Sequence, residues 1–212
     1  MAQALSQDLV CTKANMLVRT VYCNIMRCTP KPPTPEQVPL ALGTGTGDYI
    51  SYGHGGAMVA RDGDPNSLPI AKGELIYTGR YAGIRVVEGN NDSGDVSLVR
   101  GDAKLAVDLR DFDITGSIIG SINNRTVYDV NGNLIGSLGV IGINQGAEIS
   151  ADGRITGGTA TSYSLGHVAL GTGTFEGLFA GPNGEEIVGA IIIVEDNGGT
   201  GTQETGVLTV VD

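Results

Sequence analysis

The chain contains no tryptophan, and aromatic residues make up only 5% of its 212 positions. No run of about 18 apolar residues is present, so we expect no membrane-spanning helix. A barrel that spans an outer membrane carries a girdle of aromatic residues at each interface. The shortage of aromatic side chains therefore also argues against a membrane-spanning barrel.

Basic residues are scarce over most of the chain. The net charge is −10, and residues 75–212 account for all of it, with seven basic and 17 acidic side chains. No Lys or Arg follows Arg154. Such a surface repels phosphate backbones and lacks the basic segments that anionic lipid attracts. Nucleic acid is therefore not an expected partner.

Cysteine occurs only near the N-terminus, at Cys11, Cys23 and Cys28. An odd number leaves at least one thiol unpaired, and the C-x4-C spacing at 23–28 allows a disulfide or no bond at all. A zinc site would require a fourth ligand and a tighter spacing, so none is predicted here. Residues 1–31 also lack the uninterrupted apolar segment of a standard signal peptide.

Glycine, in contrast, is abundant, with 34 residues. Glycine favours turns and bends and weakens helices, so the composition predicts an all-β protein. We divide the chain into an N-terminal tail with a Pro- and Gly-rich linker (1–47), an irregular segment with at most one short strand (48–74) and a β-domain (75–212). The proline-rich part of the linker is expected to be extended.

Alternation of apolar and polar residues marks the strands of the β-domain. In 97–109, five apolar residues share one face, and the intervening positions are mainly polar. Strands are predicted near 76–87, 97–109, 114–122, 134–142, 153–161, 167–180, 186–195 and 205–211. Turn-forming pairs separate them, at Asn123-Asn124, Asn131-Gly132, Asp152-Gly153, Asn183-Gly184 and Asn197-Gly198.

Two of these strands alternate aromatic residues with glycines. The residues are Tyr77, Gly79, Tyr81 and Gly83 in the first strand, and Phe175, Gly177, Phe179 and Gly181 in the second. Glycine inside a strand costs stability unless a neighbouring ring or sheet curvature uses the space. The pattern predicts a small closed antiparallel barrel of eight strands, preceded by an irregular N-terminal segment.

The stretch FEGLFAGPNGEEIVGAIIIVED at 175–196 raises the question of paired catalytic carboxylates. A two-residue Asn183-Gly184 loop predicts that Phe179 faces Val188 across a hairpin. Glu185 and Glu186 would then be neighbours in one strand and point to opposite faces, which a catalytic carboxylate pair cannot do. No other catalytic motif is present, so we do not expect an enzyme.

The motif G-x-F-x-G-x-F-x-G-P-x-G-E-E-x-x-G at 173–189, which includes Gly184, Glu186 and Gly189, resembles the signature hairpin of the transferrin-binding protein B barrel family. GDAKLAVDLRDFDITGSIIGSI at 101–122 resembles the paired strands that precede this hairpin, with Leu109 in place of the usual aromatic residue. The Y-x-G-x-Y-x-G motif at 77–83 also fits. The resemblance covers 75–212 and concerns structural positions, so it is weak evidence for function.

The resemblance implies a filled eight-stranded barrel on the outer surface of a Gram-negative bacterium, or outside the cell. Relatives bind host proteins, haem or solutes. The chain lacks the second barrel and the large handle domain of the transferrin binders, and it has no recognisable lipobox. Both differences argue against transferrin itself as the ligand.

Candidate ligand-binding residues are few. His54, beside Tyr52 in a predicted loop, and His167, at the start of a predicted strand, are possible haem ligands, and ordinary surface roles are the alternative. Asp62, Asp64 and Asn66 have the spacing that opens a calcium loop, but the glycine and glutamate that complete such a loop are displaced. We therefore predict no cofactor and no metal, with haem and calcium as the alternatives.

Three functional hypotheses remain. The first is a non-catalytic surface or secreted binding protein that uses the barrel as a rigid scaffold and binds a protein or small solute through loops and residues 45–74. The second is a structural subunit of a surface assembly, in which the N-terminal segment adds a strand to a neighbour. The third is a lipocalin-like carrier, which needs a hollow apolar interior.

Overall fold

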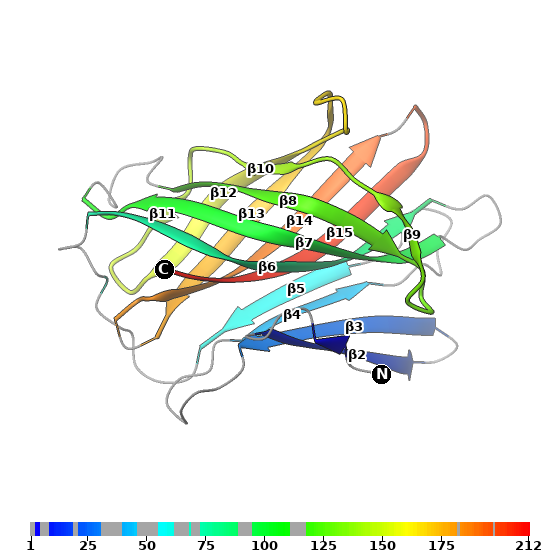
Figure 1. The fold of residues 1–212 in the computed structure, drawn as a ribbon, viewed down its shortest axis with the longest axis horizontal. Coiled ribbons are helices and arrows are strands. Elements are labelled where there is room, and N and C mark those ends of the chain that lie inside the picture. The colour runs from blue at the N-terminus through cyan, green and yellow to red at the C-terminus, as the bar shows by residue number, and fades with distance from the viewer. Residues whose placement is uncertain are drawn as a thin grey trace.

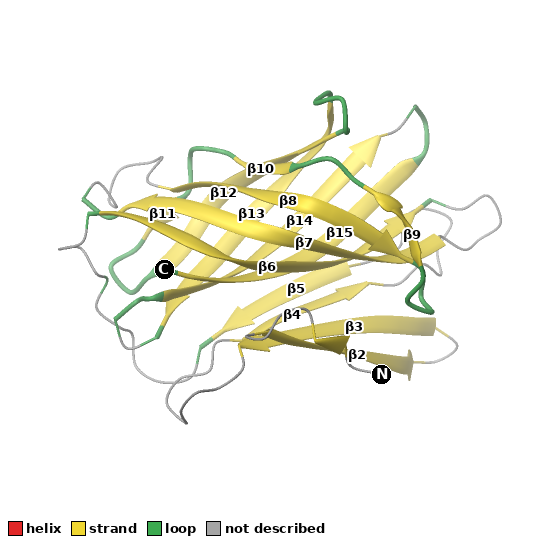
Figure 2. Cartoon of the chain, in the orientation of Figure 1, coloured by secondary structure: helices red, strands yellow, loops and turns green. Residues whose placement is uncertain are grey.

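The computed structural model describes residues 3–4, 9–18, 21–30, 40–45, 55–61, 68, 73–88, 95–110, 118–181, 183–196 and 198–212. Every regular element within them is a β-strand, so the all-β prediction is confirmed (Figure 2). No helix of the described residues could serve as a membrane span.

Eight strands form a closed antiparallel barrel, as the sequence predicts (Figure 1). They are β6 (Glu74–Val87), β7 (Asp95–Asp108), β8 (Ile118–Tyr128), β10 (Ile141–Ile143), β12 (Arg154–Tyr163), β13 (Ala169–Ala180), β14 (Glu186–Asp196) and β15 (Gly201–Val211). The spatial order is β10-β12-β13-β14-β15-β6-β7-β8. Two short strands lie beside this ring, since β9 (Leu134–Ser137) pairs with β8 and β11 (Glu148–Ile149) pairs with β12.

The barrel closes through β10, which pairs with β8 on one side and with β12 on the other. Ile141 lies opposite Ile122 on β8 and opposite Ser162 on β12. The β8–β10 contact involves only three residue pairs, so β10 is the narrowest part of the wall. We use the word seam for the contact between β8 and β10 together with the part of β8 that follows Ile122.

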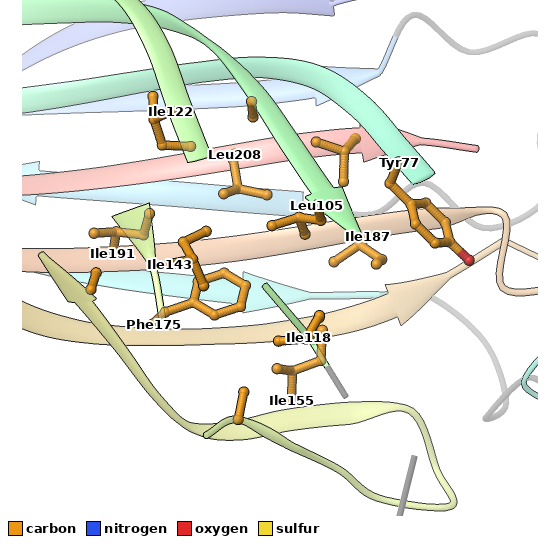
Figure 3. Close-up of a cluster of buried hydrophobic side chains, with 14 of the residues drawn as sticks. Tyr77, Leu105, Ile118, Ile122, Ile143, Ile155, Phe175, Ile187, Ile191 and Leu208 are labelled. Carbon is orange, nitrogen blue, oxygen red and sulfur yellow. The ribbon is translucent and has the colours of Figure 1, made fainter. Parts of the chain in front are cut away.

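Side chains fill the barrel interior, as the close-up in Figure 3 illustrates. The inward face of β7 carries Val99, Ala103, Leu105 and Val107, all buried, and Leu109 just beyond the strand is buried as well. The predicted burial of this face is therefore confirmed. Isoleucines of β8, β10, β12 and β14 complete the packed cluster. The hollow interior that a lipocalin-like carrier needs is absent from this cluster of described residues.

The aromatic residues of the glycine-alternating strands point inward and pack over glycines. The four rings, Tyr77, Tyr81, Phe175 and Phe179, are all nearly inaccessible to solvent. The Tyr81 ring occupies the space that a Cβ on Gly206 would need, and a Cβ on Gly189 would lie 2.7 Å from the Phe175 ring. Glycines on β14 and β15 thus make room for rings projecting from β13 and β6, which permits the tight curvature of a small barrel.

The predicted register of the β13–β14 hairpin is wrong by one residue. Phe179 lies opposite Ile187 rather than Val188, and Gly177 lies opposite Gly189. The chain turns over residues 181–185 instead of a two-residue loop, with positive φ at Gly181 and Gly184. Glu185 belongs to this turn, while Glu186 begins β14 opposite Ala180. The two glutamates are therefore not neighbours in one strand, although Glu185 still raises the pKa of Glu186 after burial, the larger cause.

Within 1–47 the structure has strands where a tail and a linker are predicted, and within 48–74 the described residues include one short strand before Glu74, which the prediction allows. Strands β1 (Gln3–Ala4), β2 (Leu9–Val18), β3 (Val21–Pro30), β4 (Leu40–Gly45) and β5 (Gly55–Ala60) form an antiparallel sheet. Strands β3, β4 and β5 contact β6, β14 and β15, so this N-terminal sheet lies against the outside of the barrel (Figure 1). Beneath it lies an apolar layer of outward-facing barrel residues, namely Ala82, Ile84, Val86, Leu98, Val188 and Val207.

The cysteines lie on β2 and β3. Cys23 and Cys28 are both on β3, five residues apart, so an extended strand separates their Cα atoms by about 16 Å. The antiparallel register places Cys28 opposite Cys11.

Candidate functional site

A half-open pocket of about 420 Å³ lies where the seam continues beyond β10. We call it the seam pocket. Its lining comes from the end of β8, the connection from β9 to β10, and the turn between β12 and β13. The lining residues are Asn123, Asn124, Arg125, Thr126, Ser137, Leu138, Gly139, Val140, Ser164, Leu165 and His167.

A β-bulge shapes the β8 side of the pocket. Gly101 on β7 faces two residues of β8, Asn124 and Arg125, because the register shifts between Arg100 and Asp102. Asn124 adopts a φ of +52°, which asparagine tolerates better than most residues. The prediction that Asn123-Asn124 separates two strands is therefore wrong, since β8 continues through the pair to Tyr128.

The opposite side of the pocket is a tight turn at residues 164–167. The Ser164 N–H donates to the Val168 carbonyl over 2.8 Å, and the His167 N–H donates to the Ser164 carbonyl over 3.0 Å. His167 has a φ of +61°. It thus lies in the turn before β13 rather than in a strand. Among the residues that the structure describes, Asn124 and His167 are the two non-glycine residues with positive φ, and both line this pocket.

Backbone strain of this kind costs about 1–3 kcal/mol and concentrates at functional sites. Its occurrence at two residues from distant parts of the sequence, on opposite sides of one pocket, marks the seam pocket as the leading candidate site. Leu165, which lines the pocket, is exposed, and so are Val168 on the same turn and Leu134 and Ile135 on β9.

Behind the pocket lies a buried ionic cluster of two arginines and two glutamates. Arg125 Nη2 is 2.5 Å from Glu204 Oε2, and Arg85 Nη2 is 2.6 Å from Glu195 Oε2. Arg85 Nη1 also lies 3.4 Å from Glu204 Oε2. The four charges balance, which is how a protein interior accommodates ions.

Tyr81 completes this cluster. Its hydroxyl donates to Glu204 Oε1 over 2.7 Å, and burial together with the Glu204 charge raises the pKa of the phenol well above its ordinary value. The hydroxyl therefore stays protonated and holds Glu204 in place. Burial alone would lower the pKa of Arg85, but the hydrogen bond to Glu195 and the charge of Glu204 raise it overall.

Arg125 connects the ionic cluster to the pocket. Its Nη1 donates to the Gly139 carbonyl over 2.8 Å, which ties β8 to the β9–β10 connection. Its Nε is buried and has no hydrogen-bond partner among the described residues. Such buried, unsatisfied donors are rare in folded proteins and often indicate a bound water or ligand.

The hydroxyl of Ser164 and the imidazole of His167 both belong to the pocket lining. Ser164 Oγ accepts a hydrogen bond from the Val168 N–H over 3.1 Å. Among the described residues, no hydrogen bond joins the side chain of Ser164 to the imidazole of His167. A serine nucleophile needs such a bond to its base. Within the described part of the chain no group of His, Cys, Asp or Glu is arranged to hold a metal ion.

The structure brings one predicted ligand residue, His167, into the seam pocket. His54 and Tyr52 lie outside the described residues, as do Asp62, Asp64 and Asn66, so the haem and calcium alternatives for those segments stay predictions. Arg125, Asn124 and Ser164 were not foreseen. The Asn123-Asn124 pair is the signal that the sequence offers at this part of β8, but by itself it predicts an ordinary turn.

No protein-family model and no curated protein sequence matches the chain. The solved structures that are similar to it include the following two. One is intact Ap-TbpB with its N and C lobes, at 12% identity and a TM-score of 0.44, covering 95% of this chain and 38% of that one. The other is a mutant of the vaccine antigen transferrin-binding protein B from Haemophilus parasuis Hp5, at 13% identity and a TM-score of 0.44, covering 99% and 38%.

The chain thus spans less than two fifths of either structure. At this identity and TM-score the likeness does not establish family membership or function. The closed barrel itself rests on the strand pairings of the chain.

Proposed function

We propose that the chain is a non-catalytic binding protein, exposed on a cell surface or secreted, that uses the barrel as a rigid scaffold. The seam pocket and its apolar surroundings form the binding face. The observation that carries this proposal is the convergence of Asn124 and His167, both with positive φ, on one pocket of about 420 Å³. That volume lies within the usual range for ligand pockets.

The lining favours an occupant with both polar and apolar groups. Its amide, hydroxyl and imidazole groups lie beside the aliphatic side chains of Leu138, Val140 and Leu165, and Arg125 is its charged residue. A haem would require a larger apolar slot than these side chains offer. A solute with polar and apolar parts, or a polar side chain of a protein partner whose apolar neighbours cover Leu165 and Val168, fits better. The resemblance to bacterial surface barrels supports a location outside the cell.

Site-specific photo-crosslinking tests the binding face. A photoreactive residue at Leu165 samples the pocket opening, and the same residue at Thr156 samples the exposed wall of the same strand pair near its other end. Nine residues of nearly extended chain separate the two positions by about 30 Å. Each variant is expressed in the native host and irradiated, and adducts are identified by mass spectrometry.

We expect an adduct at position 165 and none at position 156, and the mass of the adduct will distinguish a protein from a solute. Equal crosslinking at both positions, or none at either, contradicts the proposed binding face. Trypsin added to intact cells tests the location separately. Loss of barrel peptides without lysis supports surface exposure, whereas complete protection contradicts it unless the protein is found in the medium.

A structural subunit is the second candidate, because β9 resembles an open edge. Its four residues are all exposed, Leu134 and Ile135 by 64% and 60%, and its one partner among the described strands is β8. Adding a strand from a second copy would cover these side chains. Light scattering over a range of concentrations distinguishes the candidates, since the binding module stays small and an assembly subunit grows. The N-terminal strands β3 to β5 contact the barrel of their own chain, which favours the binding module.

A further inference from the structure

A second pocket, of about 260 Å³, lies on the outer face of β6, β7 and β8. Its lining includes Arg80, Arg100, Asp102, Asn124 and Tyr128. It shares Asn124 and Thr126 with the seam pocket, but it lies on the β7 side of β8 rather than on the seam side. We call it the outer pocket.

The outer pocket concentrates positive charge in an acidic protein. Of the seven basic residues in 75–212, Arg85 and Arg125 belong to the buried ionic cluster. Three of the other five, Arg80, Arg100 and Lys104, lie on this one face. Arg80 is the register partner of Asp102, and Arg100 and Lys104 flank Asp102 on β7, two residues away on either side.

Asp102 is the one carboxylate in the pocket lining, which holds the guanidinium groups of Arg80 and Arg100, and Lys104 lies beside the lining on the exposed side of β7. Residues 75–212 carry 17 acidic side chains against seven basic ones, so a lining with more cations than carboxylates departs from the average of this part of the chain. The outer pocket should therefore attract anions, whereas the chain as a whole, with a net charge of −10, repels them.

Neighbouring groups hold the cationic side chains in defined positions. The Arg100 guanidinium lies 4.6 Å from the centre of the Tyr128 ring, in a cation–π contact. Arg80 forms an ion pair with Asp102, and Asn124 Nδ2 donates to the other carboxylate oxygen of Asp102 over 2.8 Å. Thr126 adds a hydroxyl at the pocket wall. Guanidinium groups restrained in this way lose little entropy when they bind an anion.

We propose that the outer pocket binds an oxyanion group, a phosphate, sulfate or carboxylate, carried on a compact ligand. Guanidinium groups match the planar or tetrahedral oxygens of such anions with paired N–H donors, and the Lys104 ammonium adds a point charge. The ligand is compact because a long polyanion would extend onto the acidic surface beyond the pocket and be repelled. The proposal is independent of the seam pocket, since neither Arg100 nor Lys104 lines it.

The test is a titration of the full chain with inorganic phosphate at constant ionic strength, followed by NMR of backbone amides and arginine Nε–H groups. Chloride at the same ionic strength is the reference anion, and citrate and sulfate are the alternative oxyanions. The variant Arg100→Gln removes one cation from the pocket lining, and Lys104→Gln removes the cation beside it on β7. Arg154→Gln removes one exposed cation from a distant turn and is the matched control. Asp102→Asn removes the carboxylate that competes with the ligand.

We expect saturable shifts at β7 and β8 in the outer pocket. Affinity should fall about fivefold in Arg100→Gln and in Lys104→Gln, and stay unchanged in Arg154→Gln. It should rise in Asp102→Asn, a gain that a merely structural role for these residues would not produce. Lys104 is exposed, so its variant keeps the test valid even if Arg100→Gln folds poorly.

Two results would overturn the proposal. One is the absence of saturable shifts with all three oxyanions, and the other is equal weakening by Arg154→Gln and Lys104→Gln, which would indicate the net charge alone. Sedimentation with phosphatidylglycerol vesicles, compared with phosphatidylcholine vesicles, identifies the source of the phosphate. Retention by the anionic vesicles assigns a lipid headgroup, and phosphate binding without retention assigns a soluble anion.

Discussion

Arg125 on β8 reaches across the barrel to Glu204 on β15, and the two strands are separated in the wall by β6 and β7. The Nη2–Oε2 distance is 2.5 Å, and both side chains are 1% exposed. This bond links opposite walls of the barrel beside the seam, where β10 contributes only three residue pairs to β8. The same Arg125 side chain donates to the Gly139 carbonyl in the β9–β10 connection, so Arg125 supports closure at the point where the backbone pairing is weakest.

Breaking this ion pair should strongly destabilise the barrel. Arg125→Met leaves Glu204 with Arg85 and Tyr81 but removes its shortest ionic contact, and we expect a loss of about 3–5 kcal/mol in the free energy of unfolding. Urea denaturation measures it. Arg154→Met is the control, since its ion pair with Asp152 is exposed and is expected to contribute little to stability.

A double variant separates the ion pair from general loss of packing. Arg125→Met combined with Glu204→Gln should lose less stability than the sum of the single variants, because no unpaired charge stays buried. Strict additivity of the two losses would show that Arg125 and Glu204 contribute independently.

The fit of Tyr81 against Gly206 should tolerate no added methyl group. Gly206→Ala would place a Cβ inside the Tyr81 ring, so either the ring or β15 must move, at a cost of about 1–3 kcal/mol in unfolding free energy. Gly136→Ala is the control, because nothing lies within 4 Å of its Cβ position. It should leave thermal stability unchanged or slightly raised. If both variants melt at the same temperature, the ring is not seated on Gly206 in solution.

The barrel could be predicted because its signals are local. The alternation along 97–109 and the alternation of rings and glycines in β6 and β13 depend only on neighbouring residues. The apolar and aromatic faces that these patterns define are buried in the structure. The predicted hairpin register is wrong because Asn183-Gly184 is a strong signal for a two-residue turn, whereas Gly181 also has a positive φ and the turn is wider. A one-residue change in register moves side chains to the opposite face, so this error is not minor.

The site could not be predicted in the same way because it depends on contacts distant in sequence. Arg125 and Glu204 are 79 residues apart, and nothing near either one indicates burial. Charged residues are rarely buried, and the sequence does not show which arginine will meet which glutamate inside the barrel. Asn124 and His167 meet at one pocket only because the seam brings the end of β8 beside the turn after β12. Strand β4 was missed because prolines and Gly-Thr repeats dominate the composition of the linker in which it lies.

Glu186 should make stability depend on pH. Burial, and secondarily the charge of Glu185, raises the pKa of Glu186 above its ordinary value of 4.5. A carboxyl group with a raised pKa in the folded state favours folding while it is protonated, and this contribution is lost as pH rises through the folded-state pKa. Glu186→Gln keeps the neutral form at every pH.

The variant and the wild type should therefore unfold at the same denaturant concentration at pH values well below 4.5. The variant should become the more stable of the two as pH rises above that value. Glu176→Gln, on the exposed face of β13, is the control and should show no such divergence. A constant difference between Glu186→Gln and the wild type across this pH range would contradict the raised pKa.

The apolar layer between the N-terminal sheet and the barrel gives the last prediction. Val59 on β5 packs against the outward-facing cluster that includes Ile84, Val188 and Val207, whereas its neighbour Met58 is 51% exposed. Val59→Asp buries a carboxylate in this layer, at a cost of several kcal/mol, which should release the sheet. The barrel should stay folded, since its closure involves no residue of the first 60.

Hydrogen exchange measured by mass spectrometry tests this. In Val59→Asp, exchange should rise in β3, β4 and β5 and stay low in β12 and β13, whereas Met58→Asp should behave as the wild type. Simultaneous loss of protection in β12 and β13 would mean that the sheet and the barrel fold as one cooperative unit. Unchanged protection in both variants would mean that Val59 is not buried in solution. The first outcome would make the sheet part of the scaffold, so its strands would have to be kept in any fragment used to study binding.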